Sequence, residues 1–113
     1  MGAYSQATRA GSFVFVSGQG PADPRTGRKV EDFKGQVHQT LGNIKAILEA
    51  AGSSMENVVK ATVYINDTRN WGMLNEVWTH YFPKDPPARA VVEIAHLDIA
   101  AEIEVIAIVP EKG

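Results

Sequence analysis

The sequence contains no cysteine, and histidine is scarce. Without a thiol, the chain cannot form disulfides, thiolate metal sites or a cysteine nucleophile. The three histidines, His38, His80 and His96, lack the spacing of metal ligands. We therefore expect no metal site, and any catalysis must depend on other side chains.

An excess of positive charge and a long apolar run are also missing. The 113 residues include 11 lysines and arginines against 13 aspartates and glutamates, which gives a net charge of −2. This balance offers phosphate backbones no general attraction, so we expect no nucleic-acid partner. No apolar run approaches the roughly 20 residues that a membrane-spanning helix needs, and nothing is typical of a signal peptide. The sequence predicts a cytoplasmic protein without a membrane partner, and a mitochondrial location stays open if a longer leader has been trimmed.

What is present is a series of short, well-separated elements within one expected domain, residues 1–113. Alternating or β-branched runs predict strands, and apolar residues at helical spacing predict two helices. In chain order, we expect strands over residues 4–10, 12–19, 59–66, 88–94 and 102–109, and helices over 33–51 and 71–81. The order β-β-α-β-α-β-β favours an α+β fold in which both helices cover one face of a mixed sheet.

The face of the sheet away from the helices carries apolar side chains as well. The run Phe13-Val14-Phe15-Val16 predicts burial on both faces of its strand. In the last strand, Ile106 and Ile108 alternate onto the side that the helices do not cover. We therefore expect this face to pack against copies of itself, in a closed symmetric oligomer with clefts between subunits.

Both C-terminal strands carry charged residues among apolar ones. Arg89 and Glu93 share one side of the first strand, and Glu102 and Glu104 share one side of the second. Charges are costly to bury unless they are paired. These four residues therefore indicate either a solvated outer face or a reaction site.

Several motifs along the chain resemble the Rid/YjgF family of reactive intermediate deaminases, which belongs to the endoribonuclease L-PSP superfamily. The motifs are Tyr4-Ser5-Gln6-Ala7, Phe13-Val14-Phe15-Val16-Ser17-Gly18-Gln19, Asn75-Glu76-Val77-Trp78, Pro87-Ala88-Arg89-Ala90 and Glu102-Ile103-Glu104. The resemblance runs nearly end to end. It implies a chorismate-mutase-like fold and a homotrimer whose three sheets form a central barrel, with sites in the clefts between subunits. It also implies hydrolysis of enamines and imines, such as 2-aminoacrylate, to 2-keto acids and ammonium without a cofactor.

The resemblance assigns the chemistry to Arg89 and Glu102. Arg89 matches the arginine that holds the substrate carboxylate; the alternative is an ion pair with Glu93 or Glu104. Glu102 matches the acidic residue that handles protons; the alternative is a solvated strand carboxylate. The segment between the two is two residues shorter than is common in the family, so counting from Arg89 selects Glu104. The Glu-Ile-Glu-x-Ile-Ala pattern selects Glu102, which we prefer.

The resemblance also implies five substrate-binding residues: Tyr4, Ser17, Gly18, Trp71 and Val91. Tyr4 has the alternative role of an interface aromatic, and Ser17 with Gly18 that of a simple strand break. Trp71 matches a phenylalanine that closes the pocket, although a tryptophan in a helical stripe also suits a core. Val91 stands where many relatives have cysteine, so we expect only backbone contacts there.

One motif residue and two other functions complete the expectations. Asn75 is expected to hydrogen-bond backbone within the subunit. The first other function is a small-carboxylate-binding or chaperone-like module that uses the same arginine without turnover. The second is a single-strand endoribonuclease or translation inhibitor. The acidic balance and the lack of a groove signature of interleaved aromatic and basic residues argue against the second.

Overall fold

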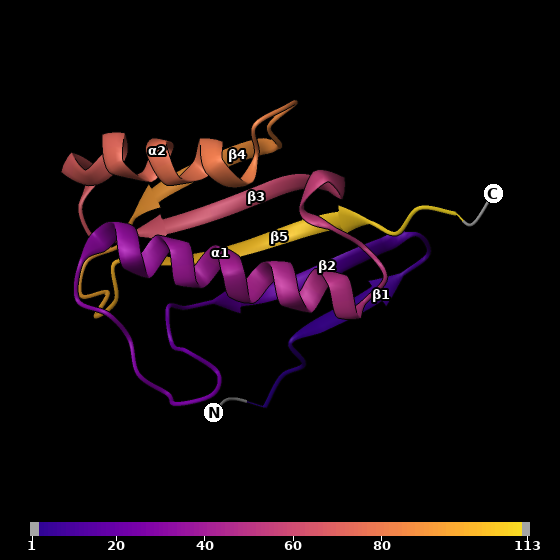
Figure 1. The fold of residues 1–113 in the computed structure, drawn as a ribbon, viewed down its shortest axis with the longest axis horizontal. Helices are drawn as coiled ribbons and strands as arrows, with labels where there is room; N and C mark the ends of the chain where they lie inside the picture. Colours follow the sequence, from indigo (N-terminus) through magenta and orange to yellow (C-terminus); the bar gives the residue numbers. More distant parts are fainter. Residues whose placement is uncertain (1–2, 112–113) are drawn as a thin grey trace.

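The computed structural model describes residues 3–111, which form one five-stranded sheet and two main helices (Figure 1). In chain order the elements are β1 (Ala7–Ala10), β2 (Phe13–Gln19), α1 (Phe33–Ala50), the short η1 (Met55–Asn57), β3 (Val58–Ile65), the short η2 (Thr68–Asn70), α2 (Trp71–Tyr81), β4 (Ala88–Glu93) and β5 (Ala101–Ile108). The strands lie in the order β1-β2-β5-β3-β4. β3 and β4 pair in parallel, and the other neighbours pair antiparallel. The predicted α+β fold with its mixed sheet is confirmed.

Both helices lie on one face of the sheet, as predicted. α1 crosses β5 and β2, and α2 lies over β4 (Figure 1). The apolar stripe of α1 faces the sheet, and Val37, Leu41, Ile44 and Leu48 are fully buried. α1 begins where the Asp32 carboxylate accepts a hydrogen bond from the Gly35 amide at 2.9 Å. Within residues 3–111, no helix is long and apolar enough to cross a bilayer.

A buried glutamine joins α1 to the start of β5. The Gln36 amide nitrogen donates to the Val30 carbonyl at 2.8 Å, and its oxygen accepts from the Ala100 amide at 2.7 Å. Such bonds satisfy polar groups that would otherwise be costly to bury. Gln36 therefore fixes the backbone just two residues before Glu102.

The first strand is shorter than the sequence predicted. β1 begins at Ala7 rather than at Tyr4. The residues before it are held by Ser17, whose amide donates to the Gln6 carbonyl at 2.9 Å and whose hydroxyl donates to the Ser5 carbonyl at 2.6 Å. One backbone bond and one side-chain bond therefore hold this segment beside β2.

The face of the sheet away from the helices is open to solvent in the single chain. Val14 and Val16 are buried under α1, but Phe13 and Phe15 are 43% and 41% exposed. The predicted burial of this run on both faces is therefore wrong for one chain by itself. We call this surface the open face; it also carries Tyr64, Val92, Glu102, Glu104, Ile106 and Ile108.

Candidate functional site

Arg89 lies on the edge strand β4 and points toward α2. Its partner in the ladder with β3 is Ala61, which is fully buried beneath the helices. Because residues paired directly across a ladder project to the same face, the Arg89 side chain lies on the helix side of the sheet. Its Nη2 atom donates a hydrogen bond to the Asn75 side-chain oxygen at 2.8 Å.

Two indole rings border the same guanidinium. The Arg89 Cζ atom lies 5.3 Å from the centre of the Trp71 ring and 5.0 Å from that of the Trp78 ring. A cation within about 6 Å of an aromatic face is attracted by the electron density of the ring. Burial lowers the pKa of Arg89 below its ordinary value, yet an arginine stays charged at neutral pH. The result is a half-buried, permanent positive charge.

The contacts of Arg89 correct one expectation and do not support one alternative. Asn75 hydrogen-bonds this guanidinium rather than backbone. Arg89 also forms no ion pair with Glu93 or Glu104 within residues 3–111. Glu93 instead accepts from the Thr68 amide at 2.8 Å.

Glu102 lies on β5 and packs against the backbone of Gly18. A Cβ atom added to Gly18 would lie 2.6 Å from the Glu102 Oε2 atom, closer than real contacts allow. The regular pairing of β2 with β5 is interrupted between Val16 and Gln19, which leaves room for the carboxylate. The structure therefore brings Glu102 and Gly18 together, and the hydroxyl of the preceding Ser17 donates to the Ser5 carbonyl.

The two glutamates of β5 have different surroundings. Glu104 accepts a hydrogen bond from the Tyr64 hydroxyl at 3.2 Å. The negative charge of Glu104, and secondly burial, raises the pKa of Tyr64 above its ordinary value of 10.0. Within residues 3–111, the Glu102 carboxylate has no such side-chain partner. The preference for Glu102 over Glu104 as the proton-handling residue stays a prediction, and this difference favours it.

Within one chain, the Arg89 group and the Glu102 group are far apart. Arg89 of β4 pairs with Ala61 of β3, the strand between β4 and β5. Glu102 of β5 pairs with Tyr64, which lies three residues after Ala61 on β3. Two strand spacings and three residues of rise separate their Cα atoms by roughly 14 Å. Glu102 also projects from the open face and Arg89 from the helix side.

The remaining predicted residues divide between these two groups. Val91 lies two residues after Arg89, on the same side of β4, and packs against the core. Trp71 is 46% exposed beside Arg89. Tyr4 is 67% exposed and precedes the segment that Ser17 holds near Glu102.

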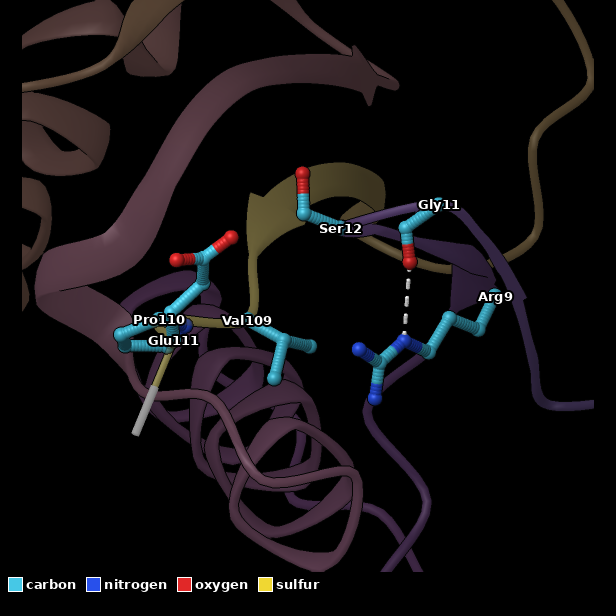
Figure 2. A pocket seen from close by; sticks show the side chains of 6 residues that line it. All are labelled: Arg9, Gly11, Ser12, Val109, Pro110 and Glu111. Atoms are coloured by element: carbon cyan, nitrogen blue, oxygen red, sulfur yellow. Dashed lines mark hydrogen bonds between the residues drawn. The ribbon is translucent and has the colours of Figure 1, made fainter. Parts of the chain in front are cut away.

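Two surface hollows lie away from Arg89. A hollow of about 510 Å³ lies at the β1–β2 turn and the end of β5. Figure 2 shows Arg9 on one side and Glu111 on the other, with Val109 between them; the Arg9 Nε atom donates to the Gly11 carbonyl at 3.0 Å. A second hollow of about 180 Å³ lies on the open face and includes Lys60 and Glu104. Within residues 3–111, no three His, Asp or Glu side chains gather into a metal-binding group.

The structure shows two contacts of Arg89 that the sequence did not predict, those with Asn75 and Trp78. Trp71, Asn75 and Trp78 occupy positions i, i+4 and i+7 of α2 and therefore share one helix face. That spacing was readable from the sequence. Nothing in the sequence, however, paired that face with Arg89 on the following strand.

Comparisons with known proteins identify relatives of this chain. Residues 1–109 match the profile of the family described as endoribonuclease L-PSP. A RutC family protein of Pyrococcus horikoshii is 51% identical over 95% of this chain and 87% of its own length. A 2-iminobutanoate/2-iminopropanoate deaminase of Salmonella typhimurium is 42% identical over 96% of this chain and 88% of its own. The structure of E. coli TdcF with bound serine is 40% identical, with a TM-score of 0.92, and the match covers 96% of this chain and 89% of that one.

Proposed function

We propose that this chain, which belongs to the endoribonuclease L-PSP family and is of the Rid/YjgF type, hydrolyses small enamines and imines that carry a carboxylate, releasing 2-keto acids and ammonium. The observation that carries the proposal is Arg89, a half-buried cation without an acidic partner in the described residues. A planar guanidinium can grip both oxygens of a carboxylate. Such a cation suits a substrate that supplies the missing negative charge.

The proposed reaction needs little from the protein. An enamine such as 2-aminoacrylate takes up a proton on carbon and becomes an iminium. Water then adds to the C=N carbon, and one of its protons moves from oxygen to nitrogen. The C–N bond breaks as the second proton leaves the oxygen, and the departing ammonia takes up that proton, which leaves a keto acid and ammonium. The iminium carboxylate and one water thus give the 2-keto carboxylate and NH₄⁺, with atoms and charge balanced. Positioning and proton transfer are the two contributions that a protein can make to these steps.

We assign positioning to Arg89 and proton transfer to Glu102. Arg89 binds the carboxylate and so fixes the position of the C=N carbon. Glu102 takes a proton from the attacking water and delivers it to the departing nitrogen. The Glu102 carboxylate is partly exposed on the open face, and its packing against the Gly18 backbone fixes its position. Tyr4, Ser17, Trp71 and Val91 are proposed to line the same site.

The proposed site needs more than one copy of the chain. Arg89 and Glu102 project from opposite faces of the sheet in a single chain, so a second copy must bring its Glu102 to the first copy's Arg89. The open face, with Phe13 and Phe15 more than two-fifths exposed, offers the apolar surface for such packing. We propose a homotrimer in which three open faces form a central barrel. Sedimentation that gives a monomer at micromolar concentration would contradict it.

Two named relatives support the choice of substrate class. The Salmonella relative is named as a deaminase of 2-iminobutanoate and 2-iminopropanoate, which are small imines with a carboxylate. E. coli TdcF was solved with serine, a small molecule that also carries a carboxylate. Both names fit an arginine anchor better than a nucleic-acid site.

The test is a coupled assay in which a serine or threonine dehydratase generates the imine and keto-acid release is followed with and without this protein. We expect faster release with the wild type and near-complete loss of that effect in Arg89→Ala. The matched control is Arg25→Ala, because Arg25 is exposed and pairs with Asp23 in a loop. Unchanged release with folded wild-type protein would overturn the proposal.

Two outcomes would favour the other functions. Calorimetric binding of pyruvate that depends on Arg89, without any acceleration, would indicate a carboxylate-binding module. Cleavage of a labelled single-stranded RNA that survives in Arg89→Ala and Glu102→Gln would indicate a ribonuclease.

A further inference from the structure

Three side chains of α2 surround Arg89, and we call Trp71, Asn75 and Trp78 the α2 clamp. We infer that the α2 clamp sets the direction in which Arg89 presents its guanidinium, and that its lack of negative charge keeps that guanidinium available to the substrate carboxylate. The inference rests on the proposed function. It makes Asn75 and Trp78 positioning residues, because they act through Arg89, and it gives Trp71 the same role in addition to its proposed place in the lining of the site.

Both rings contact the guanidinium. Trp71 and Trp78 are seven residues apart on α2, which places them two turns apart on one helix face. The Arg89 Cζ atom lies over both rings, 5.3 Å from the centre of the Trp71 ring and 5.0 Å from that of the Trp78 ring. Each ring therefore limits rotation of the long side chain.

Asn75 fixes the remaining orientation. It lies between the two tryptophans on the same face of α2, and it accepts a hydrogen bond from the Arg89 Nη2 atom at 2.8 Å. An arginine has five N–H donors in one plane, so one bond to Asn75 leaves others free. The donors lie in the guanidinium plane, so the remaining ones can meet a carboxylate there, which is the geometry of a two-oxygen contact.

The charge of the clamp matters as much as its shape. A half-buried arginine is often held by a carboxylate, which neutralises it and competes with any anionic ligand. Here an amide oxygen and two ring faces perform that task, and within residues 3–111 no ion pair involves Arg89. The clamp therefore holds the cation without neutralising it.

Asn75→Asp is the decisive variant. Aspartate has the size of asparagine and accepts a stronger hydrogen bond, so a purely structural role would leave the variant intact or more stable. If the neutral charge of the clamp matters, the new carboxylate competes with substrate. We expect the Kd for pyruvate and the KM to rise about tenfold or more, with a smaller change in kcat, from the strength of a part-exposed charge pair.

Two further variants test the rings. Trp78→Leu removes a buried ring that is 5% exposed, and we expect about tenfold weaker pyruvate binding from loss of a partly desolvated cation–π contact. Trp78→Phe restores a ring and should recover most of the affinity. Met73→Leu, on an exposed part of the same helix, is the control and should bind as the wild type does. If Trp78→Leu does not fold, Asn75→Asp decides.

Tryptophan fluorescence provides a readout that needs no turnover. The chain has two tryptophans, and both contact Arg89. Pyruvate should therefore change the emission of Trp71→Phe and of Trp78→Phe, and the change should vanish when Arg89→Gln is added to either. Folded Asn75→Asp with wild-type pyruvate affinity would overturn the inference while leaving deamination intact. Arg89-dependent pyruvate binding without deamination would overturn the proposed function and leave the clamp standing.

Discussion

Substitution of Gly18 by alanine tests whether the position of the Glu102 carboxylate matters for turnover. The new Cβ would lie 2.6 Å from Glu102 Oε2, 2.9 Å from its Cδ and 3.2 Å from its Cγ. Ordinary contacts begin near 3.4 Å, so the carboxylate must shift by roughly 1 Å or rotate away, at a cost of about 0.5–1.5 kcal/mol for an off-rotamer side chain. Only the far end of a side chain moves, so the fold should survive.

The expected consequence for activity is much larger than that for stability. A shift of about 1 Å in a catalytic group can lower a rate by roughly a hundredfold. We expect Gly18→Ala to lower kcat by about that factor. The KM should change little, because Arg89 on the far face is untouched. The imine-release assay measures the rate, and urea unfolding measures the stability.

Gly42→Ala is the matched control for this substitution. Gly42 lies inside α1, and its added Cβ would meet only the Tyr81 hydroxyl, at an ordinary 3.9 Å. Replacing a helix-interior glycine with alanine should stabilise the protein by about 0.5–1 kcal/mol and leave turnover unchanged. Wild-type kcat in Gly18→Ala would refute the reasoning, because the proton-handling group would then not be the carboxylate that packs on Gly18.

Two other predictions concern the glutamates of β5 and the hydrogen bond that holds the start of this strand. Glu102→Gln should abolish imine hydrolysis, whereas Glu104→Gln should keep most of it, and the reverse pattern of activities would select Glu104. Glu104→Gln should also lower the pKa of Tyr64 toward 10.0, because loss of the negative charge favours the phenolate. An alkaline absorbance titration measures that pKa. Gln36→Leu should cost about 1–3 kcal/mol, because the Ala100 amide loses its buried partner; an unchanged urea midpoint would contradict it.

Much of the fold was predictable because its periodic patterns are local. Apolar residues at helical spacing identified α1, and the alternation in β3 and β5 identified half-buried strands. The main error came from Phe13 and Phe15, whose apolar character predicted burial that a single chain does not provide. Sequence pattern reports which side chains avoid water in the functioning protein, and that state can include partners that one chain lacks.

The candidate site was predictable in its residues but not in its geometry. Motif resemblance selected Arg89 and Glu102, and alternation placed Arg89 with Val91 on one side of β4. Alternation alone did not identify the side that faces the helices, because that side carries the charged Arg89 and Glu93 beside Val91, whereas the other side carries only small and apolar residues. The pairing of Arg89 with Ala61 settles that point, and the α2 clamp depends on it.

The opposite faces of Arg89 and Glu102 lead to a prediction about mixed assemblies. If a site takes its arginine from one copy and its glutamate from another, Arg89→Ala and Glu102→Gln proteins should each be inactive alone. Unfolded together in equal amounts and refolded, they form assemblies in which about a quarter of the interfaces join an intact Arg89 to an intact Glu102. We expect about a quarter of the wild-type activity to return in the imine-release assay. If both residues served from the same chain, every site would carry one defect and the mixture would stay inactive, which would refute the shared site and not the roles of the two residues.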